Sequence, residues 1–367
     1  MRIVRIAAWR QEQPFRDGPY RVSGGREATG FDAVVVAVET DEGLTGWGEM
    51  APLGATYDPA FAAGARAALA EMAPGLIGCD AAQPGAAARR MDALLKGHPY
   101  AKAALDMAFW DLLGKRARLP LAELLGGRYG DSVALYRSVS QEAPARMAER
   151  AARYAGQGYR RIQVKVGGDP EEDVARVRAV AAAVPAGTVL FADANGGWPA
   201  HAARRFLALA RGLDFTLEQP CATYEECRRL RAQCDRPLVL DESIDGLPAL
   251  VRAAHDGVAD GITIKLARVG GIGPARLIRD TAVALGLMVT VEDTGGSDID
   301  TAAMAHLSLS TPEERRLHTV DFNAWVTLSN AAGMPPARDG RLGAPAAPGL
   351  GVEPRLETLG EPFHESG

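Results

Sequence analysis

Five short apolar runs between residues 163 and 265 constrain the fold of this chain more than any other feature of its sequence. Each run ends on one charged residue, and these residues are Lys165, Asp193, Glu218, Asp241 and Lys265. They follow one another at intervals of 23 to 28 residues, and each interval carries a helical pattern. This spacing predicts repeated βα units with parallel strands, in which every charged residue lies at the carboxyl end of a strand.

Repeated βα units of this kind are typical of an eight-stranded barrel, whose active site lies at the carboxyl ends of the strands. We predict the first two strands at 133–139 and 162–166, the seventh at 288–291 and a weak eighth at 318–321. Helical periodicity occurs near 170–184, 201–210, 224–233, 248–255, 274–285 and 299–309. The predicted fold class is α/β, with a (β/α)₈ barrel of the TIM type at residues 126–321.

Residues 1–125 do not follow the βα rhythm. Three predicted strands at 3–9, 31–39 and 44–49 precede helical stretches near 59–73, 84–95 and 100–115, an order typical of a separate α+β domain. The connection between the first two strands is rich in Gly, Pro and charge, and its length indicates a functional lid. Residues 322–367 are too few for a domain, and we expect them to pack back onto the N-terminal domain.

Composition and the chain's first residues exclude several classes of protein. The net charge of −5 does not favour a nucleic-acid partner. The N-terminus lacks the apolar core of a signal peptide, and no apolar run reaches membrane-spanning length. The four cysteines form no CxxC pair, which argues against a zinc or redox site. We expect a cytoplasmic protein that binds a small molecule and neither nucleic acid nor membrane.

Three of the five strand-end residues are acids, and their convergence indicates a metal site. Asp193, Glu218 and Asp241 would repel one another in one pocket, and a divalent cation removes that conflict. Oxygen ligands favour a hard ion, and Mg²⁺ keeps positions open for water and substrate. The alternative is that each acid pairs with an arginine or a lysine. Zinc is disfavoured because no histidine ends one of these strands.

The two lysines fall on the second and sixth strands, which lie opposite each other in an eight-stranded barrel. Burial and a nearby cation would lower the pKa of each amine and make it a base. Two bases around a cation suit abstraction of the proton next to a carboxylate, because the metal stabilises the enediolate. Proton return on the opposite face inverts the centre, whereas expulsion of a β-leaving group is dehydration. The alternative role of Lys165 and Lys265 is a pair of structural salt bridges.

The ordered motifs DANGGW, LEQP, LDES and IKLARVGG, preceded by QVKVG, resemble the enolase superfamily in its muconate-lactonising-enzyme branch, which is mandelate-racemase-like. The resemblance covers nearly the whole chain and implies a capping domain, a barrel and a C-terminal tail that returns to the cap. By motif, Asp193, Glu218 and Asp241 match the magnesium ligands of the family, and Lys165 and Lys265 match its acid/base lysines. A Lys or His base with Mg²⁺ is general in this superfamily. We also expect a homo-oligomer.

The chain departs from the family pattern at three places. Gln163 stands where many relatives carry a lysine, so the role of that position is open. Asp321-Phe322-Asn323 stands in place of the Asp-x-Asp of dipeptide epimerases. No histidine follows the seventh strand, which disfavours the mandelate-racemase variant with a histidine base.

Finer resemblance indicates a proline-like substrate. PYRVSGGRE and the GWGE stretch resemble cis-3-hydroxy-L-proline dehydratases, whereas GHPYAKAALD and RIQVKVGG resemble hydroxyproline-betaine 2-epimerases. Both groups place an acid near the ring nitrogen, so Glu292 and Asp293 are candidates for that contact. We favour racemisation or epimerisation of a proline-like amino acid or its betaine, with β-dehydration as the alternative. Further candidate substrate contacts are Tyr20, Ser23, Met50, Tyr57, Gln163 and Asn195.

Two other classes of barrel stay open. Lys165 would form a Schiff base in a pyridoxal-phosphate enzyme, but the three acids have no task there. No glycine loop is placed to bind the phosphate of that cofactor, and Gly270-Gly271-Ile272-Gly273, after the sixth strand, is only a weak candidate. A non-catalytic carboxylate-binding barrel would bind its ligand without exchanging the α-proton.

Overall fold

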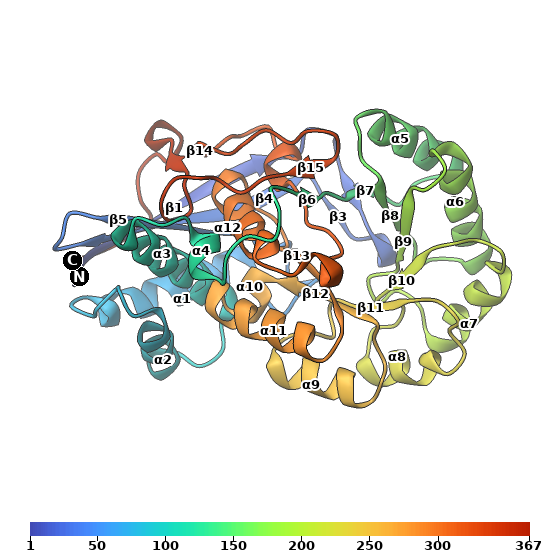
Figure 1. Cartoon of the computed structure of the whole chain (residues 1–367), viewed down its shortest axis with the longest axis horizontal. Coiled ribbons are helices and arrows are strands. Elements are labelled where there is room, and N and C mark those ends of the chain that lie inside the picture. Colours follow the sequence, from blue (N-terminus) through green and yellow to red (C-terminus); the bar gives the residue numbers. More distant parts are fainter.

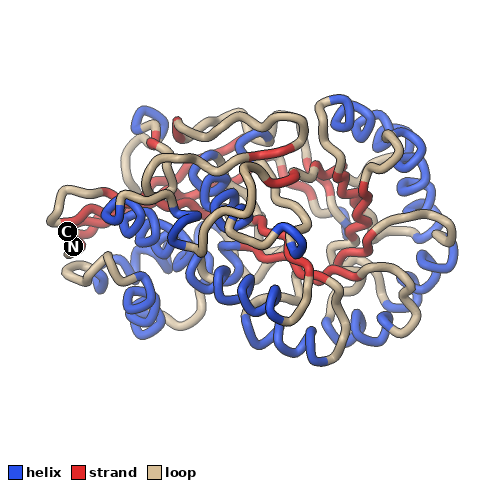
Figure 2. The backbone as a smooth tube through the Cα atoms, in the orientation of Figure 1, coloured by secondary structure: helices blue, strands red, loops and turns tan.

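The computed structural model describes all 367 residues and contains two sheets of different kinds (Figure 1 and Figure 2). A four-stranded antiparallel sheet has the order β17-β1-β4-β5, and a seven-stranded parallel sheet has the order β13-β12-β11-β10-β9-β8-β7. The parallel sheet curls into a barrel that helices surround (Figure 1). The predicted α/β barrel with an N-terminal α+β domain is confirmed. None of the helices has both the length and the apolar character needed to cross a bilayer.

The capping domain is built on β1 (Ile3–Pro14), β4 (Gly30–Thr40) and β5 (Thr45–Met50). Its helices are α1 (Ala62–Met72), α2 (Pro84–Leu94) and α3 (Pro99–Ala117). The approach of α3 to β5 requires glycine in the strand, because a Cβ on Gly48 would lie 1.9 Å from the carbonyl oxygen of Ala104. This close contact fixes the cap sheet on the helix that leads to the barrel.

The barrel strands follow the predicted order and end close to the predicted charged residues. They are β7 (Arg137–Val139), β8 (Arg161–Lys165), β9 (Val189–Asp193), β10 (Thr216–Glu218), β11 (Leu238–Leu240), β12 (Gly261–Lys265) and β13 (Met288–Glu292). The eighth position is an irregular segment at 316–319, which bridges Val289 on one side and Leu135 on the other. The barrel therefore closes through isolated bridges instead of the regular strand that we predict at 318–321.

The outer helices lie between successive strands. They are α5 (Pro144–Gly156), α6 (Pro170–Ala183), α7 (Ala200–Leu209), α8 (Tyr224–Arg231), α9 (Leu247–His255), α11 (Ile272–Ala284) and α12 (Asp298–Leu309). Sequence analysis missed α5, although the spacing of its buried residues, Met147, Ala151, Tyr154 and Ala155, is that of one helix face. It also missed two helices of four residues, α4 (Leu121–Leu124) and α10 (Leu266–Val269).

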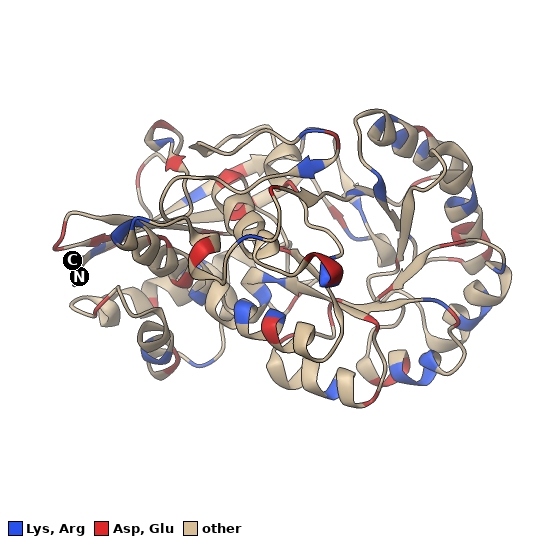
Figure 3. Cartoon of the chain, viewed as in Figure 1, with Lys and Arg blue, Asp and Glu red and all other residues tan.

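Both basic and acidic residues are distributed along the outer helices (Figure 3). Arg205 on α7 pairs with Glu171 on α6 at 2.8 Å, and Arg252 on α9 pairs with Glu225 on α8 at 3.2 Å. Each exposed pair stabilises the fold by no more than about 1 kcal/mol. The stability of the barrel therefore depends mainly on its apolar core, which continues into the cap sheet through residues such as Trp9.

The C-terminal segment crosses the barrel and ends in the capping domain. This segment forms two short antiparallel strand pairs. β15 (Arg341–Leu342) pairs with β6 (Val133–Ala134), and β14 (Ala331–Ala332) pairs with β16 (Glu353–Pro354). The last strand, β17 (His364–Ser366), then adds an edge to β1. Both ends of the chain consequently lie beside each other in the cap (Figure 1).

The predicted lid is a small hairpin that reaches from the cap to the barrel. It consists of β2 (Tyr20–Arg21) and β3 (Glu27–Ala28). Tyr20 Oη lies 2.9 Å from Ser138 Oγ, and the Arg21 amide donates to Ser140 Oγ at 2.7 Å. The hairpin is therefore hydrogen-bonded to the carboxyl end of β7 and the residues that follow it.

Candidate active site

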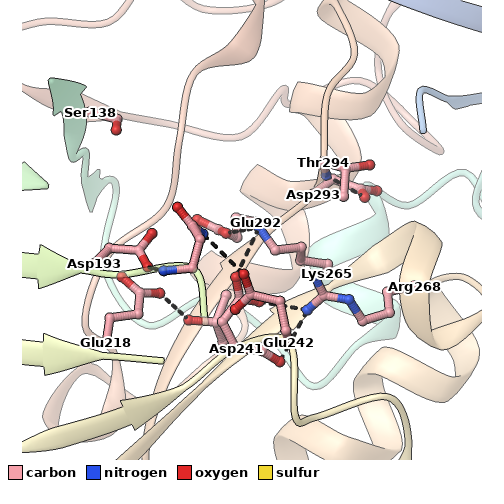
Figure 4. A network of polar contacts seen from close by, with 12 residues as sticks. Ser138, Asp193, Glu218, Asp241, Glu242, Lys265, Arg268, Glu292, Asp293 and Thr294 are labelled. Atoms are coloured by element: carbon pink, nitrogen blue, oxygen red, sulfur yellow. Dashed lines mark hydrogen bonds and ion pairs between the residues drawn. The ribbon is translucent and has the colours of Figure 1, made fainter. Parts of the chain in front are cut away.

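Strand register brings the predicted charged residues together at one end of the barrel. Lys165, Asp193 and Glu218 are direct partners across β8, β9 and β10, and Lys265 is the partner of Glu292 across β12 and β13. All five side chains are buried. Figure 4 shows the acids of β9 and β10 facing those at the ends of β11 and β13 across a shared space.

The acids on β9 and β10 differ in the charge of their partners. Asp193 pairs with the amine of Lys165, whereas Glu218 accepts hydrogen bonds from two neutral groups. Gln163 Nε2 donates to Glu218 at 2.8 Å, and Thr263 Oγ1 donates at 3.0 Å. Gln163, two residues before Lys165, therefore acts as a hydrogen-bond donor that holds the Glu218 carboxylate.

Asp241 lies at the centre of a positively charged cluster. Arg268 Nη1 contacts it at 2.6 Å, Lys265 Nζ lies at 3.3 Å, and Tyr57 Oη donates a hydrogen bond at 2.9 Å. Arg268 is held in turn by Asp58 of the cap, with 2.8 Å between Nε and Oδ1. The cap thus orients Asp241 through both Tyr57 and Asp58.

These neighbours set the charge of the acids in opposite ways. Burial, together with the charges of Asp193, Glu292 and Asp241, raises the pKa of Glu218 well above its ordinary value. Burial also opposes ionisation of Asp241, but Arg268 and Lys265 outweigh it and lower the pKa of Asp241 to about 2. The surroundings therefore oppose the ionisation of Glu218 and favour that of Asp241.

The lysines differ from the sequence-based expectation. Burial favours the neutral amine of Lys165, but the charges of Asp193, Tyr20 and Glu218 outweigh it, and the pKa of Lys165 is raised. Burial acts in the same direction on Lys265, and Asp241 and Glu292 again raise its pKa. The expected lowering of the lysine pKa is wrong for this structure, because each amine is paired directly with a carboxylate.

The residues fit a hard divalent cation by their chemistry, although the side chains do not enclose one. No three Asp, Glu, His or Cys side chains converge closely enough to hold an ion, because Asp193 and Asp241 face their basic partners. Burial and the neighbouring carboxylates together raise the pKa of Glu218, and a cation would offset both effects. Two buried oxygens beside the acids, Asn195 Oδ1 and Glu242 Oε2, also lack a hydrogen-bond partner.

A small pocket lies between these strand ends and the cap, with a cavity volume of about 30 Å³. Its polar floor contains both lysines, Gln163, Glu292 and Asp293. The wall formed by the cap and tail is mostly aromatic and apolar and consists of Phe15, Tyr20, Val22, Phe31, Leu53, Tyr57, Phe322 and Trp325.

The two lysines approach the pocket from opposite sides of the barrel. Strands β8 and β12 are four positions apart in the sheet order, which is half of an eight-membered ring. Lys165 Nζ lies 5.7 Å from the ring centre of Tyr20, and Lys265 Nζ lies 5.2 Å from that of Tyr57. A flat molecule in the pocket would therefore present one face to each amine.

Five of the eight predicted substrate contacts line this pocket, namely Tyr20, Tyr57, Gln163, Glu292 and Asp293. Ser23 and Asn195 do not: they are buried at the junction of lid and barrel, and Asn195 Nδ2 donates to Glu242 at 3.1 Å. Met50 is fully buried in the core under the cap helices. Strand alternation turns Met50 away from the barrel and turns Glu49 toward it.

Several functional neighbours escaped sequence analysis. Tyr136 donates to Glu292 at 2.5 Å, and Arg268, which Asp58 holds in place, pairs with Asp241. Arg268 lies within the quoted IKLARVGG motif, and Tyr136 lies within the strand predicted at 133–139, so both had a local signal. Trp325 comes from the tail, where no periodic pattern indicates a pocket.

The fold and the site define an enzyme with a TIM barrel, an N-terminal cap and an acid–lysine active site. Residues 6–126 match the N-terminal domain family of mandelate racemase / muconate lactonizing enzyme, and residues 146–358 match the enolase C-terminal domain-like family. The chain therefore belongs to the enolase superfamily, in its mandelate racemase / muconate lactonizing branch.

Similar proteins support the same conclusion. The chain is 47% identical over 99% of both sequences to the cis-3-hydroxy-L-proline dehydratase of Roseibium aggregatum. It is 28% identical over 98% of both sequences to the N-succinyl-L-Arg/Lys racemase of Bacillus cereus. A crystal structure of an enolase superfamily member from Roseovarius nubinhibens, complexed with magnesium, has a TM-score of 0.93 at 39% identity and covers 99% of each chain. The chain is an enzyme of the isomerase or lyase type.

Proposed function

We propose that this enzyme dehydrates cis-3-hydroxy-L-proline or a closely similar cyclic 3-hydroxy amino acid. The observation that carries the proposal is the position of Lys165 and Lys265 on opposite sides of one small pocket. The 47% identity to a cis-3-hydroxy-L-proline dehydratase supports this substrate, whereas the similar racemases and epimerases are only 28–34% identical to the chain. We therefore place dehydration ahead of the epimerisation that the sequence alone favours.

The stereochemistry of this substrate suits two opposed groups. In cis-3-hydroxy-L-proline the hydroxyl and the carboxylate share one ring face, so the α-proton lies on the other face. One lysine would remove the α-proton while the other protonates the departing hydroxyl. The Cα–H and C3–O bonds break, a Cα=C3 double bond forms, and water leaves. The resulting cyclic enamine tautomerises to the imine.

We further propose that Asp193, Glu218 and Asp241 hold a divalent cation, Mg²⁺ being the ion named in the similar structure. When bound, such an ion stabilises the charge that develops on the substrate carboxylate. Gln163 and Thr263 orient the Glu218 carboxylate, and Tyr57 orients that of Asp241.

The rest of the pocket fits a small cyclic amino acid, which is the partner we propose. Asp293 and Glu292 would face the positively charged ring nitrogen. The aromatic wall from the cap and tail would cover the ring and exclude water, which strengthens the electrostatic contacts below it. A cytoplasmic location and assembly into a homo-oligomer remain part of the proposal.

Proton NMR in D₂O with cis-3-, trans-3- and trans-4-hydroxy-L-proline tests the reaction. With Mg²⁺ present, the cis-3 isomer should give the cyclic imine. The trans-3 isomer should react more slowly, because its α-proton and hydroxyl share one face. If no hydroxyproline changes while N-acyl amino acids or dipeptides turn over, the proposed substrate class is wrong.

The second candidate is epimerisation of a proline-like amino acid or its betaine, which the same opposed lysines favour. In the D₂O experiment it would appear as deuterium at the α-carbon with inversion and without loss of water. An absorbance band near 400 nm in the purified protein would instead indicate a Schiff base with pyridoxal phosphate. Binding without α-proton exchange would indicate a non-catalytic barrel.

A further inference from the structure

Three buried carboxyl groups form a row from the substrate pocket to the capping domain. Asp293 follows β13 and lines the pocket. Asp300 lies in the first turn of α12, where the charges of both Asp293 and Glu49 act on it, and its backbone amide donates to Glu49 near the end of β5. The side chains are at most 1% exposed. No part of the proposed reaction explains why three acids are adjacent here.

Two members of the row have donors that stabilise a negative charge. Asp293 accepts hydrogen bonds from the backbone amides of Ala267 at 2.9 Å and Thr294 at 2.7 Å. Figure 4 shows Asp293 and Thr294 together beyond Lys265. Glu49 accepts four hydrogen bonds at 2.5–3.0 Å, from Gln13 Nε2, Asn330 Nδ2, Ser297 N and Asp300 N.

Asp300 has no such partner. Both of its carboxyl oxygens are buried and accept no hydrogen bond from any donor. The charged groups that act on it are Asp293 and Glu49, both acidic, whereas the charge of Lys265 lowers the pKa of Asp293. An ionised carboxylate without a donor, placed between two others, is strongly unfavourable. A protonated Asp300 removes this conflict and supplies an O–H group next to Asp293.

The backbone keeps Asp300 in this position. Gly296 has a φ of 148°, and a Cβ at that residue would lie 2.5 Å from Asp300 Cβ. The Asp300 amide donates to Glu49 at 3.0 Å, which ties the start of α12 to the cap. Two separate constraints therefore fix the position of the Asp300 backbone.

We propose that Asp300 is a positioning residue that stays a neutral carboxylic acid and donates a hydrogen bond to Asp293, holding Asp293 ionised toward the ring nitrogen of the substrate. This inference rests on the proposed function, because the ring nitrogen supplies the positive charge that Asp293 would face. Burial raises the pKa of Asp293 to about 7, against the lowering effect of the two backbone amides, Asp300 and Lys265. Without Asp300, less of Asp293 would be ionised at neutral pH.

The variants Asp300→Asn and Asp300→Ala test whether Asp300 acts as a hydrogen-bond donor or only fills space in the core. The asparagine keeps size and an N–H donor, so its KM should stay within about threefold of wild type at pH 7. The alanine removes the donor, so its KM should rise about tenfold to a hundredfold, as for the loss of a hydrogen bond to a charged group. The ratio of its KM to that of wild type should fall toward pH 9, because Asp293 regains its charge.

The matched control is Asp298→Asn, in the same helical turn. Asp298 already accepts hydrogen bonds from Asn323 at 2.9 Å and Ser329 at 2.6 Å, away from the pocket. Its variant should show no pH-dependent change in the KM ratio. If Asp300→Asn raises KM as much as Asp300→Ala, or if the alanine ratio is constant with pH, the proposal is overturned.

Urea unfolding of wild type and Asp300→Asn between pH 6 and pH 9 tests the protonation without using activity. Folded wild type holds one proton that the unfolded chain releases, because an unfolded aspartate has a pKa of about 4. The folding equilibrium constant of wild type should therefore fall about tenfold per pH unit relative to the variant, until Asp300 ionises. A ratio that does not vary with pH would show an ionised Asp300 and overturn the proposal.

The activity assay and the unfolding series test two different claims. A protein that turns over no hydroxyproline or betaine refutes the proposed function and the ring-nitrogen contact of Asp293. The unfolding series still decides the protonation of Asp300 in that protein. A protein that dehydrates the substrate but shows no pH trend in unfolding keeps its function and loses this inference.

Discussion

Lys165 and Lys265 are identical side chains with different neighbours. Lys165 pairs with Asp193, whereas Lys265 lies between Asp241 and Glu292. Lys→Ala at either position should lower the dehydration rate about 10²- to 10⁴-fold, the usual contribution of a general acid or base. With cis-3-hydroxy-L-proline in D₂O, the variant without the base should show neither exchange nor elimination. The variant without the acid should exchange the α-proton and retain the hydroxyl.

Lys102→Ala is the control, because Lys102 is a largely buried lysine of the cap that pairs with Asp92 at 2.7 Å, outside the pocket. Its rate should be close to that of wild type. Exchange lost equally in Lys165→Ala and Lys265→Ala would contradict two lysines on opposite faces of the substrate.

Among single residues, Glu218 is the one whose substitution tests the metal site. Chelation should abolish activity and added Mg²⁺ should restore it. Mg²⁺ should also stabilise wild type, by about 2.7 kcal/mol at 100 times its Kd. Glu218→Gln should lose most of this stabilisation, measured by thermal unfolding, whereas Asp106→Asn should keep it. Asp106 is an equally buried acid whose partner is the Gly273 amide at the start of α11. Full activity after exhaustive chelation would refute the metal site.

At the scale of the element, the β2–β3 hairpin is held to the barrel by two serines. Ser138→Ala removes one hydrogen bond of about 1 kcal/mol, and Ser140→Ala removes two contacts with Arg21, so the ratio of docked to undocked hairpin should fall about fivefold or more. If the hairpin is a lid, KM should rise by at most the factor by which this ratio falls, since only the docked state binds fully. Ser132→Ala is the control, because Ser132 contacts Arg341 on the surface. Unchanged KM in both lid variants would argue against a lid.

For the whole molecule, His306 joins the three parts of the chain. On α12, its Nδ1 accepts from the Ala122 amide at 3.1 Å, and its Nε2 lies 3.1 Å from the Leu350 carbonyl oxygen of the tail. Burial lowers the pKa of His306 to about 4 from an ordinary value of 6.5. The unfolded chain then binds more protons between these values, so stability is present above pH 6.5 and is lost as the pH falls toward 4.

This shift corresponds to about 3 kcal/mol of unfolding free energy. Urea unfolding of wild type and His306→Gln from pH 7 to pH 4 should show that amount as the difference in their pH dependence. The comparison with the variant is needed because the pKa of buried Asp106 is raised to about 7, which has the opposite effect in this range. Parallel curves for the two proteins would contradict the prediction.

Periodicity along the chain was enough to place the barrel, the separate cap and the five charged strand ends. A parallel βα repeat fixes where each strand ends, so Asp193 and Lys265 could be assigned to one face without any knowledge of contacts. The same reasoning overlooked α5, although its buried residues have the spacing of one helix face. It also predicted a regular eighth strand at 318–321, where isolated bridges close the barrel. It also misplaced Met50, whose direction depends on the face of β5 that α3 covers.

Long-range packing alone decided the partners of these residues. Tyr57 and Asp241 are 184 residues apart in the chain, and Tyr136 and Glu292 are 156 apart, so no local pattern could pair them. The pKa of each lysine also depended on packing, because direct contact with carboxylates outweighs burial. Strand periodicity is a property of neighbouring residues, whereas charge pairing and burial arise only when distant segments meet.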